Sequence, residues 1–238
     1  MIGFTIGFGA ILIGRQTTSR WLHHVAVAAG LTTAAITTYQ SRTLFSPPPW
    51  VIREKKYAAL ATRLPLADAT TVLDVGCGTG RSLVGIAPFV PETCSVIGLD
   101  VFDDRVILGN SPALAIRNGR AAGLDVTAVA GDATRLPIAS DTQDVVTACR
   151  VLHDLPATDQ PKALEELHRV CAPDGTLGVL ELPLTPAATS ADPESYWRQQ
   201  LTDAGFAVKV CHQVDSPHRT DPYHVFIATP SAKAECGA

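Results

Sequence analysis

The sequence lacks the features that mark several classes of protein. It has 19 Lys and Arg against 23 Asp and Glu, so no excess of positive charge is present to attract a nucleic acid backbone. Its six cysteines form no C-x-x-C pair and lie mostly in apolar segments, which is typical of free buried thiols and unlike a zinc or disulfide framework. His212, His218 and His224 are too scattered along the chain to indicate a metal site. We therefore predict that the protein binds neither nucleic acid nor metal.

The amino-terminal part lacks charge over two long runs. Residues 1–14 are apolar or small, and residues 21–39 are uncharged apart from two histidines. The second run is close to the roughly 20 residues that a membrane-spanning helix needs, and more basic residues follow it than precede it. We therefore expect membrane contact through residues 1–39, with the rest of the chain cytoplasmic and attached to the inner face of the cell membrane. Helices lying in the membrane interface and a cap buried on a soluble domain are the alternatives, because glycine and threonine weaken a spanning helix.

Prolines divide the chain into parts. The stretch S-P-P-P-W at residues 46–50 cannot continue a helix, so we expect the amino-terminal segment to end there. The sequence predicts four parts: an apolar helical segment over residues 1–45, a linker and lead-in helix over 46–70, one α/β domain over 71–230, and a flexible tail over 231–238.

A glycine-rich stretch, V-L-D-V-G-C-G-T-G at residues 72–80, is the strongest local signal in the chain. An apolar, β-branched run passes through an aspartate into three glycines, and a helix-compatible segment follows. This order predicts a strand, a tight turn and a helix. Glycines at alternate positions allow positive φ angles and let a ligand touch the main chain, so the turn is suited to close ligand contact.

The spacing of these glycines separates two kinds of ligand. A dinucleotide-binding turn has its third glycine one residue further on, where this chain has Arg81. Asp74 would repel a pyrophosphate and suits a ligand that carries an ammonium group. D-V-G-C-G-T-G resembles the first motif of the class I S-adenosylmethionine-dependent methyltransferases. The resemblance implies that Asp74 lies near the ammonium group of the cofactor S-adenosylmethionine (SAM), and that Gly76, Gly78 and Gly80 admit its methionyl part.

Two later strand ends extend the resemblance. An apolar strand predicted over residues 93–100 ends at Asp100, and an aspartate about 20 residues beyond the glycines can accept both hydroxyls of a ribose. The next strand leads into G-D-A-T-R-L-P at residues 131–137, which resembles the adenine-contacting turn of the family. The resemblance implies that Asp132 and Ala133 hold the adenine. Capping of backbone amides is the alternative role for both aspartates.

His153 is the candidate for proton transfer. It follows a strand predicted over residues 141–150, in the segment that faces the transferable methyl group in relatives of this family. Its pKa near neutrality suits it to take a proton from an acceptor hydroxyl or amine, whereas a structural hydrogen bond or helix cap is the alternative. Asp154 either orients His153 or caps the next helix. Glu181, at the end of a strand predicted over residues 176–181, is expected on the acceptor side or in solvent.

Strand and helix patterns alternate from residue 71 to residue 229. They predict an α/β fold with a doubly wound, mostly parallel seven-stranded sheet of the Rossmann-like methyltransferase type, a closing antiparallel pair and apolar N-terminal helices. The resemblance implies a SAM-dependent methyltransferase but does not identify its acceptor. The apolar amino terminus favours a small or apolar acceptor that is lipid-, quinone- or isoprenoid-like. The rivals are a non-catalytic methyltransferase-like scaffold and an NAD-binding oxidoreductase, for which the glycine spacing is wrong.

Overall fold

The computed structural model of the protein describes residues 20–45, 55–105, 107, 109–187, 189–215 and 221–231. The chain divides into two compact units, Met1–Pro47 and Pro48–Ala238. In the first unit, α2 (Arg20–Phe45) is a helix in which Thr32 and Thr33 donate their hydroxyls to carbonyls one turn earlier, at 2.9 and 2.8 Å. No helix among the described residues has both the length and the apolar character needed to cross a membrane. The first apolar run and the proline stretch lie outside the described residues.

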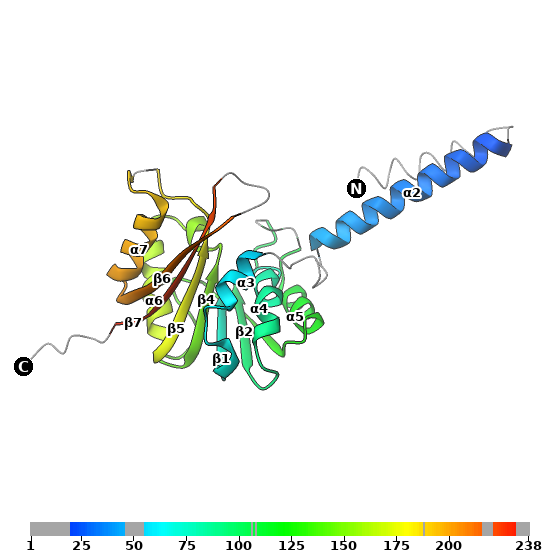
Figure 1. The fold of residues 1–238 in the computed structure, drawn as a ribbon. Helices are drawn as coiled ribbons and strands as arrows, with labels where there is room; N and C mark the ends of the chain where they lie inside the picture. Colours follow the sequence, from blue (N-terminus) through cyan, green and yellow to red (C-terminus); the bar gives the residue numbers. More distant parts are fainter. Residues whose placement is uncertain are drawn as a thin grey trace, which may run out of the picture. The chain divides into compact units, whose positions relative to one another are not determined.

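The second unit is built on a seven-stranded sheet (Figure 1). Its strands are β1 (Thr71–Val75), β2 (Ser95–Asp100), β3 (Val126–Ala130), β4 (Gln143–Cys149), β5 (Cys171–Glu181), β6 (Phe206–Val214) and β7 (Tyr223–Pro230). Their order is β3-β2-β1-β4-β5-β7-β6, with β1 to β5 parallel and β7 antiparallel to both of its neighbours. The predicted doubly wound sheet with a closing antiparallel pair is confirmed.

Helices cover both faces of the sheet (Figure 1). They are α3 (Lys55–Ala61), α4 (Arg81–Ile86), α5 (Pro112–Ala121), α6 (Gln160–Val170) and α7 (Pro193–Asp203), with short 3₁₀ turns η1 (Leu66–Asp68), η2 (Ala87–Phe89) and η3 (Leu152–Asp154). Successive residues of a strand point to opposite faces, so Val72 joins a core with α3, α4 and α5, while Leu73 joins a core with α6 and α7. The near-continuous apolar strands of the sequence reflect this burial on both faces.

One predicted boundary was wrong. The strand predicted over residues 176–181 begins at Cys171 as β5, where pairing with β4 jumps from Cys171 to Thr176 and the intervening residues bulge from the ladder. Helix α7 begins at Pro193, where the Asp192 side chain caps it by accepting a hydrogen bond from Ser195 N at 3.0 Å.

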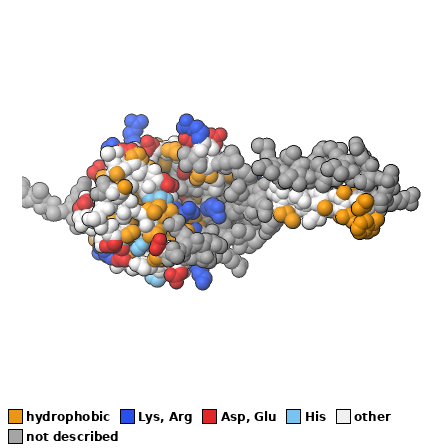
Figure 2. All heavy atoms as spheres, turned by 90° about the horizontal axis from the view of Figure 1, so that it is seen from above, with side chains coloured by type: hydrophobic (Ala, Val, Ile, Leu, Met, Phe, Trp, Pro, Cys, Tyr) orange, Lys and Arg blue, Asp and Glu red, His pale blue; other side chains and the backbone are white. Residues whose placement is uncertain are grey.

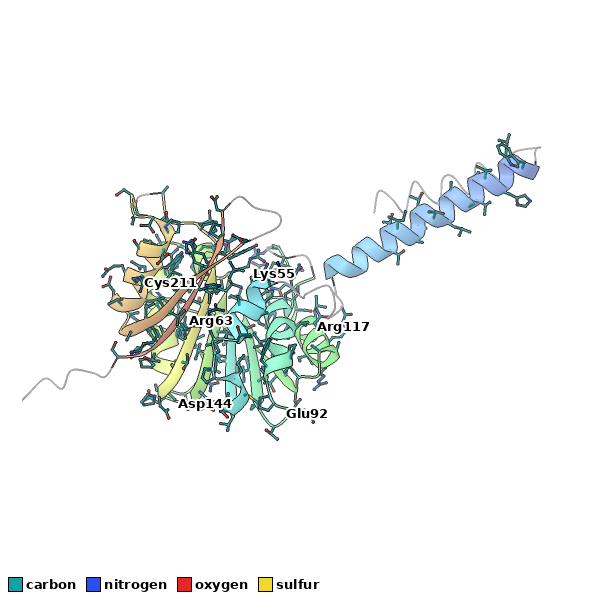
Figure 3. All side chains as sticks on the ribbon, viewed as in Figure 1. Lys55, Arg63, Glu92, Arg117, Asp144 and Cys211 are labelled. Atoms are coloured by element: carbon teal, nitrogen blue, oxygen red, sulfur yellow. The ribbon has the colours of Figure 1, made fainter. Side chains whose placement is uncertain are left out.

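The parallel strands all end at one edge of the sheet, which is the edge that positions the candidate site. Asp144 and Glu92 mark the opposite edge in Figure 3, where the Asp144 carboxylate accepts hydrogen bonds from the backbone N and hydroxyl of Thr70 at 2.8 and 2.6 Å. The carboxyl-end edge faces the viewer in Figure 2, which shows hydrophobic, histidine and basic side chains mixed on its surface. The chain leaves β1 toward β2 and leaves β4 toward β5, so the topological switch point lies between β1 and β4.

Candidate active site

The glycine turn after β1 is packed tightly against its neighbours at two of its three glycines. Gly76, Gly78 and Gly80 have φ angles of 73°, 52° and 84°, so all three use the left-handed region that glycine tolerates. A Cβ on Gly76 would lie 2.4 Å from a methyl of Val151, and one on Gly80 would lie 3.1 Å from the carbonyl oxygen of Ala115. A Cβ on Gly78 would meet only the end of Ile107, at 3.5 Å. The turn therefore packs closely on the segment after β4 and on α5, whereas Gly78, although buried, has room for a Cβ at ordinary contact distance.

Asp74 does not face open space. Its side chain is completely buried, and its carboxylate accepts hydrogen bonds from the hydroxyls of Ser82 and Thr147, the latter at 2.7 Å. Burial raises the pKa of Asp74 to about 6, against the two hydrogen bonds, which lower it. Asp74 therefore links β1 to α4 and β4 by hydrogen bonds. It would act on a ligand through its charge rather than by direct contact.

Asp100 joins the end of β2 to the glycine turn. One carboxylate oxygen accepts a hydrogen bond from Gly78 N at 3.0 Å, and the other accepts hydrogen bonds from Phe102 N at 2.7 Å and from the Asn110 amide at 3.0 Å. Asn110 is only 5% exposed, and its Oδ1 is buried without a hydrogen-bond partner in the part of the chain that the structure describes. Buried acceptors are normally satisfied, so this oxygen is a position where a ligand donor would fit.

Asp132 lies at the end of β3 in a turn that it stabilises itself. Its Oδ1 accepts hydrogen bonds from the backbone N and the hydroxyl of Thr134, at 2.8 and 2.9 Å, and these bonds lower the pKa of Asp132. Gly131 N donates to the carbonyl of Asp100 at 3.0 Å, which brings the two strand ends together. Ala133 is 8% exposed. The turn-capping role weighed for Asp132 is thus present, and it occupies one of the two carboxylate oxygens.

His153 and Glu181 form a close, largely buried pair. His153 Nδ1 lies 2.5 Å from Glu181 Oε2, and Glu181 is completely buried. The Glu181 carboxylate also accepts hydrogen bonds from Val151 N at 3.1 Å, Leu152 N at 2.8 Å and Leu182 N at 3.2 Å. Because these donors use the carboxylate as an acceptor, Nδ1 is assigned as the protonated nitrogen, which leaves Nε2 as the nitrogen that can exchange a proton.

The electrostatics of this pair favour a histidine that titrates above its ordinary range. Burial lowers the pKa of His153, but the hydrogen bond with Glu181 and the negative charges of Glu181 and Asp154 outweigh burial and raise it. An Asp154 carboxylate oxygen lies 3.2 Å from Nε2, and the Asp154 side chain is 70% exposed. Asp154 can therefore accept a hydrogen bond from a protonated Nε2 and can also move aside into solvent.

A pocket of about 160 Å³ adjoins His153. Its walls come from η3, the start of α6, the residues between them and the segment after β5, with four apolar side chains and three polar ones. They are His153, Leu155, Ala157, Gln160, Leu184, Thr185 and Pro186. Gln160 is fixed by donating to Leu155 O at 3.2 Å and by accepting from the Tyr196 hydroxyl at 2.6 Å. The pocket thus combines apolar and polar lining, with His153 at its wall.

The structure brings most of the predicted site residues to one edge, in two groups. The glycines, Asp100, Asp132 and Ala133 lie around the ends of β1, β2 and β3, and His153 lies after β4, beyond the Val151 that packs on Gly76. Two participants were missed: Asn110, and Glu181 as the partner of His153. For Glu181 the sequence signal was its position at the end of a predicted strand. That strand, β5, pairs with β4, which precedes His153.

Comparisons with known proteins identify the kind of domain. Residues 72–175 match a family model described as a methyltransferase domain. The chain is similar to the demethylmenaquinone methyltransferase of Lactobacillus johnsonii, with 36% identity over 121 residues, which are 50% of this chain and 46% of the relative. The chain spans about half the length of the curated relatives it matches.

Solved structures show the same fold. A SAM-dependent methyltransferase from Aquifex aeolicus is 24% identical with a TM-score of 0.53, covering 79% of this chain and 92% of that chain. The 1,6-didemethyltoxoflavin-N1-methyltransferase of Burkholderia thailandensis, solved with S-adenosylhomocysteine bound, is 20% identical with a TM-score of 0.60, covering 86% of this chain and 89% of that chain. At these identities the likeness is evidence for the fold alone.

Proposed function

Because residues 72–175 form a class I S-adenosylmethionine-dependent methyltransferase domain, we propose that this protein transfers the methyl group of SAM to a small, apolar, quinone- or quinol-like acceptor. The observation that carries the proposal is the buried Glu181–His153 pair at the wall of a pocket that is also lined by Leu155, Leu184 and Pro186. It lies beside the glycine turn, since Val151, two residues before His153, packs on Gly76.

The residues around the glycine turn fit SAM on two observations. A Cβ on Gly78 would make only one contact, at an ordinary distance, and the buried Asn110 Oδ1 next to Asp100 lacks a hydrogen-bond donor among the described residues. We assign Asp100 to the ribose hydroxyls, with Asn110 as its positioning residue. Gly78 belongs to the methionyl contact in this assignment, because a bare backbone there permits close approach.

The remaining assignments follow the same edge of the sheet. Gly76 and Gly80 shape the turn by packing on their neighbours, and Asp74 supplies negative charge from behind it. Asp132 and the backbone of Ala133 are assigned to the adenine, with the Asp132 oxygen that Thr134 leaves unoccupied as the acceptor.

His153 carries the chemistry that this chain itself provides. When bound, SAM supplies an electrophilic methyl group, so the protein needs to orient the acceptor, exclude water and accept a proton. Glu181 holds the imidazole by Nδ1, and Nε2 accepts the proton that the acceptor loses. Asp154 stabilises the resulting imidazolium from 3.2 Å.

The acceptor class rests on the pocket and on the relatives together. Leu155, Leu184 and Pro186 give the pocket an apolar wall, and the curated relatives named above are demethylmenaquinone methyltransferases. The predicted membrane contact of residues 1–39 would bring such an acceptor to the protein. We also propose that residues 1–39 attach the protein to the inner face of the cell membrane.

Calorimetric titration of S-adenosylhomocysteine into the full chain tests the cofactor assignment. We expect binding by the wild type, loss of affinity by about tenfold or more in Asp100→Ala, and no response to NAD. Asp103→Ala is the matched control, because Asp103 lies in the same loop but pairs only with the exposed Arg105 among the described residues, at 2.6 Å. Folded protein that binds no S-adenosylhomocysteine would sink the proposal and favour a scaffold.

A transfer assay tests the role of His153 separately. Reduced quinones with apolar tails are incubated with isotopically labelled SAM and either the wild type or His153→Gln. We expect the variant to bind S-adenosylhomocysteine normally and to transfer the methyl group about 10²- to 10⁴-fold more slowly. Equal rates would show that His153 is structural, and transfer only to polar acceptors would overturn the acceptor class.

A further inference from the structure

A cluster of metal-ligating side chains lies on α7, β6 and β7, several strands away from β1 and its glycine turn. Glu194 of α7, Cys211 of β6 and His224 of β7 each offer one ligand atom, and these atoms lie within 4.8 Å of one another. Figure 3 labels Cys211 among the side chains of this region. The three residues are far apart in sequence, which is why the scattered histidines indicated no site.

Strand pairing explains how the cluster forms. In the β6–β7 ladder Gln213 is opposite His224 and Cys211 is opposite Phe226, so the Cys211 and His224 side chains share one face of the sheet. Helix α7 packs on that face, and its first turn brings Glu194 to them. The arrangement is therefore a product of the antiparallel pair and the helix that precedes it.

A second observation points to a ligand. His224 is only 5% exposed, yet its Nδ1 is buried without a hydrogen-bond partner among the described residues. A buried imidazole nitrogen without a partner is costly, and a cation bound at Nδ1 would remove that cost.

We propose that Glu194, Cys211 and His224 form a zinc site. Thiolate, imidazole and carboxylate are the ligand types that Zn²⁺ prefers, and three protein ligands leave one position for water. A thiolate and a carboxylate together balance the charge of Zn²⁺. Cys211 releases its proton to solvent as the sulfur–metal bond forms.

The polar groups around the cluster leave Glu194 able to bind a cation. Arg198 and Gln213 contact the two Glu194 carboxylate oxygens at 3.3 and 3.4 Å, which are long contacts on exposed side chains. His224 is also directly opposite Glu181 in the β5–β7 ladder. The zinc site would thus fasten α7 and the β6–β7 edge next to the strand that carries the partner of His153.

Cobalt titration of the reduced, metal-free full chain tests the site. Co²⁺ bound to a thiolate gives a near-ultraviolet charge-transfer band, so we expect one such band at one equivalent, and its disappearance when Zn²⁺ is added. Cys211→Ser is expected to abolish the band, and His224→Gln to lower the affinity by about 100-fold or more, since even groups behind the ligands contribute 10- to 100-fold. Cys94→Ser is the matched control, a buried thiol in the turn before β2.

Alkylation provides a measurement that needs no variant. Zn²⁺ is expected to protect Cys211 from alkylation in the wild type, as read by mass spectrometry. Folded, reduced wild type that shows neither the band nor protection overturns the site, and so does a band that persists in Cys211→Ser. Binding of S-adenosylhomocysteine is measured independently, so failure of the zinc site leaves the proposed function untouched.

Discussion

Alanine substitutions in the glycine turn separate its packing role from its ligand role. Gly76→Ala places an alanine at a φ of 73° and puts its Cβ 2.4 Å from Val151. The left-handed conformation costs about 1–2 kcal/mol, and forcing a methyl into a packed site costs about 1–3 kcal/mol more. We expect a loss of about 2–5 kcal/mol in the free energy of unfolding, which corresponds to a fall in Tm of roughly 4–20 °C for a chain of this size.

Gly78→Ala has the same backbone cost as Gly76→Ala but lacks the cost of forcing a methyl into a packed site. Its Cβ would meet nothing closer than Ile107 at 3.5 Å, so only the backbone cost of about 1–2 kcal/mol is expected. The added methyl stands where the proposed methionyl contact is made. We therefore expect a folded protein whose affinity for S-adenosylhomocysteine falls by about tenfold or more.

Gly123→Ala is the matched control for backbone strain. Gly123 has a φ of 91°, and a Cβ there would meet nothing within 4 Å. Denaturant unfolding and calorimetric titration of the three variants are the assays. The reasoning is refuted if Gly76→Ala is no less stable than Gly123→Ala, or if Gly78→Ala binds S-adenosylhomocysteine as tightly as Gly123→Ala does.

Two further predictions concern pH. The raised pKa of His153 gives stability that is fully present below its ordinary value of 6.5 and is lost as pH rises through the raised value, so Glu181→Gln should cost more stability near pH 6 than near pH 8 in urea unfolding. An equal cost at both pH values would contradict the pairing. For Asp74 the fold favours the neutral form of the side chain, because its pKa is about 6 in the fold against 3.8 ordinarily. Ionisation of Asp74 therefore opposes folding, and wild-type stability should fall by up to about 3 kcal/mol as pH rises from 4 to 8. Asp74→Asn should remove that fall, and identical pH profiles for the two proteins would show that Asp74 ionises freely.

The sequence by itself determined the features that depend on neighbours along the chain. Ser111 before Pro112 is a local signal for the start of a helix, and α5 begins there with the Ser111 hydroxyl accepting a hydrogen bond from Leu114 N, at 3.3 Å. The glycine turn was readable because positive φ angles at alternate residues demand glycine. Alternating strand and helix patterns predicted the parallel sheet, because a crossover helix is what joins parallel strands.

Only the tertiary structure decided which side chains meet. Glu181 was open to solvent as far as its sequence neighbours indicate, but β5 lies beside β4, and its carboxylate is therefore buried against the turn that carries His153. Asp74 was expected at a ligand, yet Ser82 and Thr147 enclose it because α4 and β4 both pack on β1. These contacts depend on strand order and on which face each residue occupies. Neither the strand order nor the face of each residue is encoded within a short window of sequence, so such pairs form only when the sheet has assembled.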